Sequence, residues 1–150
     1  LERAKSAGIK TLVIDHKEYQ SRDLFDNDLY KVLKDHNADL IVLAGFMRIL
    51  TKKITKNFYG KIINIHPSLL PSYGGKGMYG SKIHNKVIEN NEKETGITIH
   101  YVNNEYDSGE IIFQKNICIE ENDTVTTLEE KIHKLEYEYY PKVIQSLLIR

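Results

Sequence analysis

Two apolar runs, ADLIVLAGF (38–46) and KIINIH (61–66), constrain the fold more than any other feature of this sequence. The first is almost continuously apolar, which is typical of a strand covered on both faces, and residues 51–59 between the runs can form a short basic helix. TLVIDH (11–16) is a third β-rich run, followed by a helix that Ser21 can cap. This alternation of strand and helix predicts a parallel sheet of the doubly wound kind.

The pattern changes in the second half of the chain. GITIHYVN (96–103) alternates strictly, and EIIFQKNICI (110–119) follows after a turn, so this pair predicts an antiparallel edge. Apolar residues at helical spacing predict a C-terminal helix from about Val125, which Pro141 is expected to break or kink. We therefore predict an α/β fold with an open, mostly parallel sheet, helices on both faces and an antiparallel edge, as in Rossmann-like domains.

Composition limits the class of protein. The 150 residues suffice for one domain, and 21 basic residues balance 21 acidic ones, so no net charge favours nucleic acid or an anionic membrane. No apolar run approaches the roughly 18 residues of a membrane span. Cys118 is the only cysteine, which excludes an intrachain disulfide and a thiolate metal site and favours the reducing cytoplasm. The sequence gives no indication of an oligomeric state.

The first residues, LERAKSAG (1–8), are typical of the last turns of a helix, with Gly8 as its stop. A chain that begins inside an element is expected to be a domain that lacks its N-terminal part. We therefore predict a single domain over residues 1–150, truncated at the N-terminus.

Asn64 and His66 are the first candidates for chemistry. Side chains alternate along a strand, so both point to one side at the carboxyl end of a predicted strand, where ligands of open parallel sheets bind. An amide can stabilise negative charge on a carbonyl oxygen, and an imidazole can move a proton near neutral pH. Asp107, in the turn after the alternating strand, could supply a carboxylate that orients the imidazole. Together these groups suit acyl transfer.

Simpler interpretations stay open for the same residues. An Asn-x-His pair at a strand end also fits a turn-capping amide and an ordinary buried histidine, and Asp107-Ser108-Gly109 is good β-turn chemistry. The glycines in 74–80 predict either a mobile connection or a functional loop. The six histidines never fall four residues apart, so the sequence predicts no helical metal site.

Four segments in order resemble the phosphoribosylglycinamide formyltransferases of purine synthesis: ADLIVLAGFMRIL (38–50), INIHPSLLP (63–71), ETGITIHYVNNEYDSGEIIFQ (94–114) and LEYEYYPKVI (135–144). The resemblance runs from Leu1 to nearly the end of the chain. It implies transfer of a formyl group from 10-formyltetrahydrofolate to the amine of glycinamide ribonucleotide, by direct attack and without a metal.

The resemblance also implies roles for individual residues. Asn64, His66 and Asp107 match the catalytic trio: the amide holds the formyl oxygen, the imidazole assists proton transfer, and the carboxylate favours the charged imidazole and positions a water. Glu136 matches a carboxylate near the glycinamide amine. Residues that match the folate-binding positions, with Asn64 among them and Arg22 near the folate carboxylate tail, are Arg22, Met47, Arg48, Ile49, Leu50, Asn64, Val102 and Asn103. From the residues alone, Arg22 and Glu136 fit solvated helix positions equally well.

Two features differ from the family pattern. The family opens with a strand and a glycine-rich turn that holds the ribonucleotide phosphate, and the sequence from Leu1 onward does not include this unit. In addition, YGGKGMYGSKIH (73–84) is longer and richer in glycine than the commonest family version. Methionyl-tRNA formyltransferases, sugar-amine formyltransferases and formyltetrahydrofolate deformylases share the Asn-x-His-to-Asp arrangement and remain alternatives, as does a non-catalytic folate-binding fragment. His-Pro-Ser after Ile65 and the neutral charge balance favour the purine enzymes.

Overall fold

The computed structural model of the protein describes residues 1–149, which form two compact units. The first unit runs from Leu1 to Ala38, and the second begins at Asp39. Each unit is described separately below.

The first unit is helical. It contains α1 (Glu2–Ser6), the 3-10 helix η1 (His16–Glu18) and α2 (Arg22–Asp35). Gly8 follows α1 with a φ of 71°, as predicted for a helix stop. Ser21 caps α2 as predicted, because its Oγ accepts a hydrogen bond from the Leu24 N–H at 3.3 Å.

The predicted strand over 11–16 does not form, and no strand occurs among residues 1–38. An isolated strand leaves its backbone N–H and C=O groups without partners, so a β-rich run needs a neighbouring strand. Here Leu12 and Val13 are exposed, and the Asp15 carboxylate accepts a hydrogen bond from the Lys17 N–H that starts η1. This local contact competes with extended structure.

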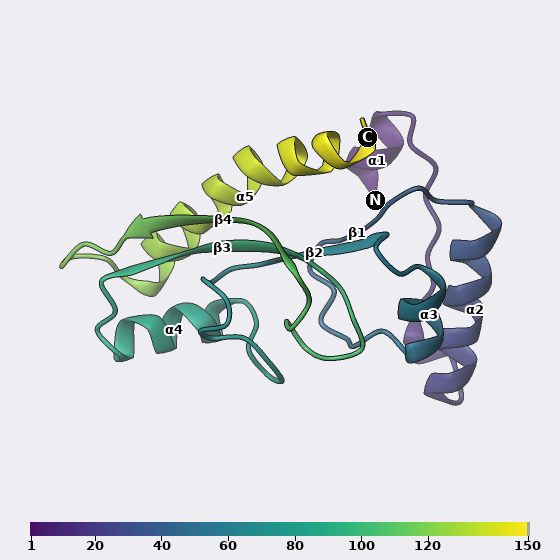
Figure 1. The fold of residues 1–150 in the computed structure, drawn as a ribbon, viewed down its shortest axis with the longest axis horizontal. Coiled ribbons are helices and arrows are strands. Elements are labelled where there is room, and N and C mark those ends of the chain that lie inside the picture. The colour runs from purple at the N-terminus through teal and green to yellow at the C-terminus, as the bar shows by residue number, and fades with distance from the viewer. Residues whose placement is uncertain (150) are drawn as a thin grey trace. The chain divides into compact units, whose positions relative to one another are not determined.

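The second unit is built on a four-stranded sheet in the order β1-β2-β3-β4 (Figure 1). Its strands are β1 (Ile41–Leu43), β2 (Ile62–His66), β3 (Glu94–Tyr101) and β4 (Ile111–Cys118). β1 and β2 are parallel and joined through α3 (Lys52–Asn57), whereas β2–β3 and β3–β4 are antiparallel. The predicted α/β fold with an antiparallel edge is confirmed. Parallel pairing is confined to β1 and β2, because 11–16 adds no strand.

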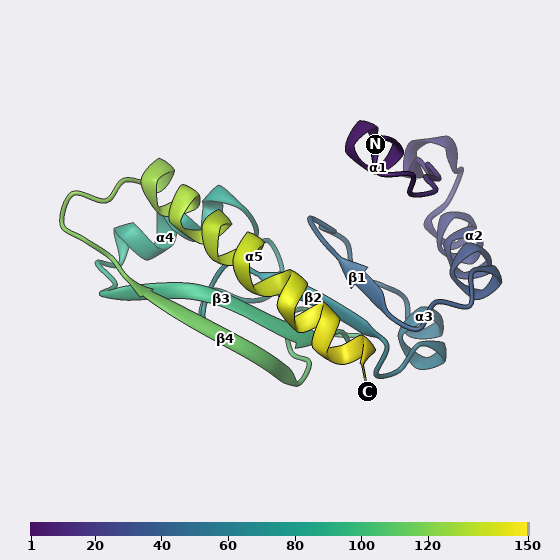
Figure 2. The ribbon, with the colours of Figure 1, turned by 90° about the horizontal axis from the view of Figure 1, so that it is seen from above.

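The two faces of the sheet differ in character. On one face, Ile63 and Ile99 pack with Tyr140 and Val143 of α5 (Val125–Leu148), and Figure 2 shows α5 lying lengthwise over the strands. Asn64, His66, Thr98 and His100 alternate with these apolar residues and so belong to the opposite face. Helix α4 (Ser81–Glu89) lies on that side in Figure 1.

Helix α5 packs against α4 near its N-terminal end and continues through Pro141. The N-terminal part of α5 packs through Leu128 against Ile83 and Val87 of α4. Pro141 lies inside α5, and the helix continues to Leu148, so of the predicted break or kink at Pro141 the break does not occur. Burial of Tyr140 and Val143 on either side of Pro141 offsets the one backbone hydrogen bond that proline removes.

Candidate functional site

A cavity of about 580 Å³ lies in the second unit where β1 and β2 end. This size is within the usual range for small-molecule sites. Every sequence-predicted site residue except Arg22 lines it: Met47, Arg48, Ile49, Leu50, Asn64, His66, Val102, Asn103, Asp107 and Glu136. Arg22 belongs to the first unit, where its Nε donates to the Asp26 carboxylate at 3.2 Å. Its folate-binding role stays a prediction.

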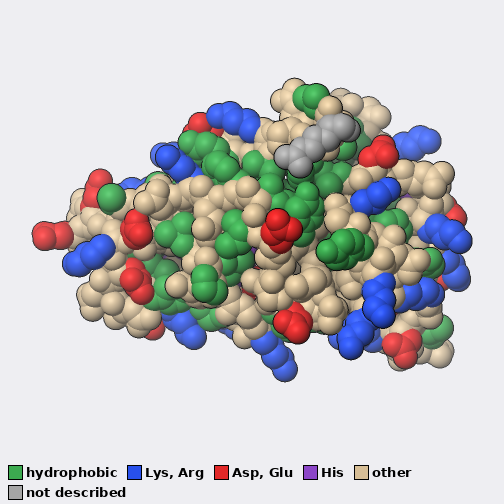
Figure 3. All heavy atoms as spheres, in the orientation of Figure 1, with side chains coloured by type: hydrophobic (Ala, Val, Ile, Leu, Met, Phe, Trp, Pro, Cys, Tyr) green, Lys and Arg blue, Asp and Glu red, His purple; other side chains and the backbone are tan. Residues whose placement is uncertain are grey.

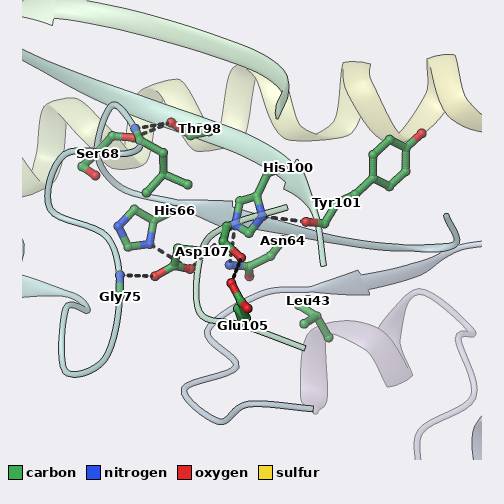
Figure 4. Close-up of polar contacts among 12 residues, drawn as sticks. Leu43, Asn64, His66, Ser68, Gly75, Thr98, His100, Tyr101, Glu105 and Asp107 are labelled. Carbon is green, nitrogen blue, oxygen red and sulfur yellow. Dashed lines mark hydrogen bonds and ion pairs between the residues drawn. The ribbon is translucent and has the colours of Figure 1, made fainter. Parts of the chain in front are cut away.

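Strand β2 carries Asn64 and His66, which both line this cavity and are drawn in Figure 4. His66 is only 4% exposed, and both of its ring nitrogens face oxygen atoms. Nε2 donates to the Tyr73 carbonyl at 2.9 Å, and Nδ1 lies 3.6 Å from Oδ1 of Asp107. A ring with a proton on each nitrogen satisfies both oxygens.

Asp107 connects the loop after β3 to the loop after β2. Its Oδ2 accepts the backbone N–H of Gly75 at 2.9 Å, and its Oδ1 faces His66 (Figure 4). Asp107 has a φ of 49°, a conformation that Asp and Asn adopt more readily than most residues. Two residues on, Gly109 passes so close to the Tyr101 carbonyl that a Cβ there would overlap it. The predicted turn therefore places the carboxylate beside the imidazole.

His100 is a member of this cluster that the sequence analysis missed. It pairs with Asn64 in the sheet, and its Nε2 lies 3.4 Å from Asn64 Nδ2 and 3.8 Å from Asp107 Oδ1. Burial lowers the pKa of His100, although its bond to the Tyr101 carbonyl and the Asp107 charge oppose that shift. The strict alternation of GITIHYVN was the available signal, but only the strand register places His100 opposite Asn64.

A buried hydrogen-bond network anchors the loop that follows His66. The Thr98 hydroxyl donates to the Ser68 carbonyl at 2.6 Å and accepts the Leu70 N–H at 3.0 Å and the Gln114 amide at 2.8 Å. Ser68 in turn donates to the Ser72 carbonyl at 2.6 Å. This network fixes the chain just before Tyr73, whose carbonyl accepts the hydrogen bond from His66 Nε2. Motif reading did not identify it.

Helix α5 contributes a carboxylate, Glu136, to the lining of the cavity. Glu136 is half-buried, and burial raises its pKa, with nearby His133 acting in the other direction. One turn further, the Tyr140 hydroxyl donates to the Leu43 carbonyl at 2.8 Å and ties α5 to β1. The resulting wall presents an ionisable group inside a mainly apolar surface. This is a typical environment for recognising a polar ligand atom.

The sequence profile of the formyl transferase family matches residues 1–144. The chain belongs to this formyl transferase family. It is 42% identical to the phosphoribosylglycinamide formyltransferase of Bacillus subtilis (strain 168), over 99% of this chain and 73% of that protein. It is also 46% identical to the trifunctional purine biosynthetic protein adenosine-3 of Gallus gallus, over 97% of this chain and 14% of that protein.

Solved structures agree with the sequence match. The crystal structure of phosphoribosylglycinamide formyltransferase from Bacillus Halodurans superposes with a TM-score of 0.88 at 39% identity, covering 98% of this chain and 73% of that one. The enzyme from Streptococcus pneumoniae TIGR4 gives a TM-score of 0.88 at 32% identity, covering 98% and 79%. The chain therefore spans about a seventh of the trifunctional relative and about three quarters of these bacterial ones.

Three further features of this member of the formyl transferase family concern its surface charge, its potential metal ligands and its helices. Figure 3 shows basic and acidic side chains interspersed over the visible face. Among residues 1–149, no group of three or more His, Cys, Asp or Glu side chains could hold a metal ion. Within the same residues, no helix has both the length and the apolar character needed to cross a membrane.

Proposed function

We propose that the protein transfers a formyl group from 10-formyltetrahydrofolate to the primary amine of glycinamide ribonucleotide in purine synthesis. The observation that carries this proposal is the convergence of Asn64, His66 and Asp107 on one cavity. Family membership supports it, because relatives along the whole chain are named phosphoribosylglycinamide formyltransferases. The proposed partners are these small molecules and not nucleic acid, and the proposed compartment is the cytoplasm.

Each of the three side chains has a proposed role in the transfer. The Asn64 amide donates a hydrogen bond to the formyl oxygen, where negative charge develops as the amine nitrogen bonds to the formyl carbon. His66 moves the proton that the amine loses toward the folate nitrogen, whose bond to the formyl carbon breaks. Asp107 stabilises the imidazole while it carries the extra proton. Direct attack between two aligned substrates requires no covalent bond to the protein.

The remaining cavity residues have proposed binding roles. Met47, Arg48, Ile49 and Leu50 follow β1 and, with Val102 and Asn103 after β3, form a wall for the pterin. The half-buried Glu136 faces them from α5 and is proposed to hold the glycinamide amine. Arg22 is proposed to contact the folate carboxylate tail.

A formyl-transfer assay with two variants tests this proposal. The protein is incubated with 10-formyltetrahydrofolate and glycinamide ribonucleotide, and formylated ribonucleotide is quantified; a second arm without the amine measures released formate. We expect formylated ribonucleotide in the first arm and no release of formate in the second. Asn64→Ala and His66→Ala should each lower kcat by about 10²-fold or more.

Two exposed residues provide matched controls: Asn57→Ala on α3 and His36→Ala after α2 should retain the unmutated kcat. Full activity of both cavity variants would refute the assigned roles. Formate release in the arm without amine, with no ribonucleotide product in the other, would instead indicate a deformylase.

A further inference from the structure

His100 occupies the centre of the polar cluster but has no role in the mechanism above. It is only 2% exposed and comes from β3, directly opposite Asn64 in the sheet. In Figure 4 its ring lies between Asn64 and the Tyr101 carbonyl, with Asp107 on the same side as Asn64. A buried imidazole in such a place must satisfy both of its nitrogens.

The hydrogen bonds of His100 define its tautomer. Nδ1 lies 2.8 Å from the Tyr101 carbonyl oxygen, which can only accept, so Nδ1 carries a hydrogen. In the neutral ring, Nε2 then has a lone pair, and Asn64 Nδ2 stands 3.4 Å from it as a donor. Neutral His100 therefore accepts a hydrogen bond from the Asn64 amide.

The surroundings of His100 favour the neutral ring. Burial lowers the pKa of His100, and so does the nearby His66. The bond to the Tyr101 carbonyl and the Asp107 charge act in the opposite direction without reversing the shift. His66 and Asp107 are the titratable groups that act on it in this cluster.

We propose that His100 is a positioning residue, which orients the Asn64 amide through its unprotonated Nε2 and leaves the Asp107 carboxylate to His66. This inference rests on the proposed function. One Asn64 amide hydrogen is held by His100, and the second is then available to the formyl oxygen. Without the acceptor, the amide can turn by half a rotation and present its own oxygen, which repels the formyl oxygen.

A protonated His100 would have two further effects on the cluster. Its Nε2–H would point at the Asn64 N–H, so two donors would face each other. It would also compete with His66 for Asp107 Oδ1, which lies 3.8 Å from His100 Nε2 and 3.6 Å from His66 Nδ1. Keeping His100 neutral thus assigns the single carboxylate to the imidazole that moves the proton.

Paired substitutions separate this role from a packing role. His100→Phe keeps a ring and removes the acceptor, whereas His100→Gln offers an amide oxygen in place of Nε2. We expect His100→Phe to lower kcat about tenfold or more with KM within about threefold, because one oriented donor is lost. His100→Gln should recover most of that loss, and His36→Phe on the first unit should have no effect. Equal kcat for His100→Phe and the unmutated protein, or no recovery in His100→Gln, would overturn the inference.

Nitrogen-15 NMR of the unmutated protein gives a readout independent of turnover and of the stability of any variant. At pH 7 we expect His100 of the unmutated protein to show a protonated Nδ1 and an unprotonated Nε2. A protonated Nε2 at pH 7 would overturn the inference. Absence of formyl transfer in the unmutated protein, with the NMR result as expected, would refute the proposed function and leave the His100–Asn64 arrangement standing.

Discussion

The carboxylate of Asp107 uses its two oxygens for different purposes. Oδ2 is fixed by the Gly75 N–H, so Oδ1 is held between two histidines, 3.6 Å from His66 and 3.8 Å from His100. Burial lowers the pKa of His100 and so favours its neutral ring, which leaves Oδ1 of Asp107 to His66. The chemistry of the site therefore depends on which imidazole is charged.

At the scale of single residues, the raised pKa of Glu136 predicts how the free energy of unfolding changes with pH. Burial raises the folded-state pKa of Glu136 above the usual range for a glutamate side chain, so the charged carboxylate is less favourable in the folded protein than in the unfolded one. As pH rises from the unfolded-state pKa through the folded-state pKa, the unfolded state loses its proton first and the free energy of unfolding falls. Glu136→Gln should therefore stabilise the protein at pH 7 and have little effect at pH 3.

Urea unfolding at the two pH values checks this prediction. Glu130→Gln is the matched control, because Glu130 lies on α5 with an exposed side chain. The control should change the free energy of unfolding equally at both pH values. If Glu136→Gln is no more stable than the unmutated protein at pH 7, the claim that burial disfavours the charged Glu136 carboxylate is contradicted.

At the scale of elements, one hydroxyl on β3 controls the loop after β2. Thr98 contacts the Ser68 carbonyl, the Leu70 N–H and the Gln114 amide, and all three contacts are buried or partly buried. Thr98→Val has nearly the same shape but removes the hydroxyl that serves the Ser68 carbonyl and the Leu70 N–H, whereas the Gln114 amide keeps its bond to the Leu70 carbonyl. We expect the free energy of unfolding to fall by roughly 2–3 kcal/mol, since each unsatisfied buried group costs about 1–3 kcal/mol and such costs do not simply add.

Chemical denaturation of two variants measures this effect. Thr98→Ser retains the hydroxyl and loses one methyl group, so it should be clearly more stable than Thr98→Val. Thr98→Val should also lower kcat, because the loop it releases carries the Tyr73 carbonyl that accepts from His66. If the Val variant proves as stable as the Ser variant, the network does not anchor the loop.

The sequence predicted those elements whose signals are local. Alternation located β3, the run after the turn located β4, helical spacing located α5, and Ser21 marked the start of α2. Each of these patterns depends on neighbouring residues alone. The strand predicted over 11–16 does not form, because a strand needs a partner. Helix α5 does not break at Pro141, because a helix can tolerate proline when packing supports it.

The same limit applies to the site: its residues with local signals were predicted, and those that depend on strand pairing were not. Period two placed Asn64 and His66 on one face, and the turn supplied Asp107. His100 and the Thr98 network depend on strand register, which spacing within one segment does not determine.

At the scale of the whole molecule, the cavity collects groups from distant parts of the chain. Asn64 and His66 come from β2, Asp107 from the loop after β3, and Glu136 from α5. No one of these elements forms a site alone, so the function depends on the folded sheet and the helix packed on it. The balanced charge of the chain fits small ligands held by a few directed contacts better than a polyanion held by a broad field.

A double-mutant cycle on formyl transfer tests the central claim, that His66 and Asp107 act as one unit, most directly. The cycle compares kcat/KM of the unmutated protein, His66→Ala, Asp107→Asn and the double variant, and Asn tolerates the positive φ at 107. If Asp107 works through the imidazole, the double variant should be about as slow as the slower single variant, with a coupling of roughly 1–3 kcal/mol. Losses that simply multiply would show that the two side chains act independently, which would contradict the mechanism.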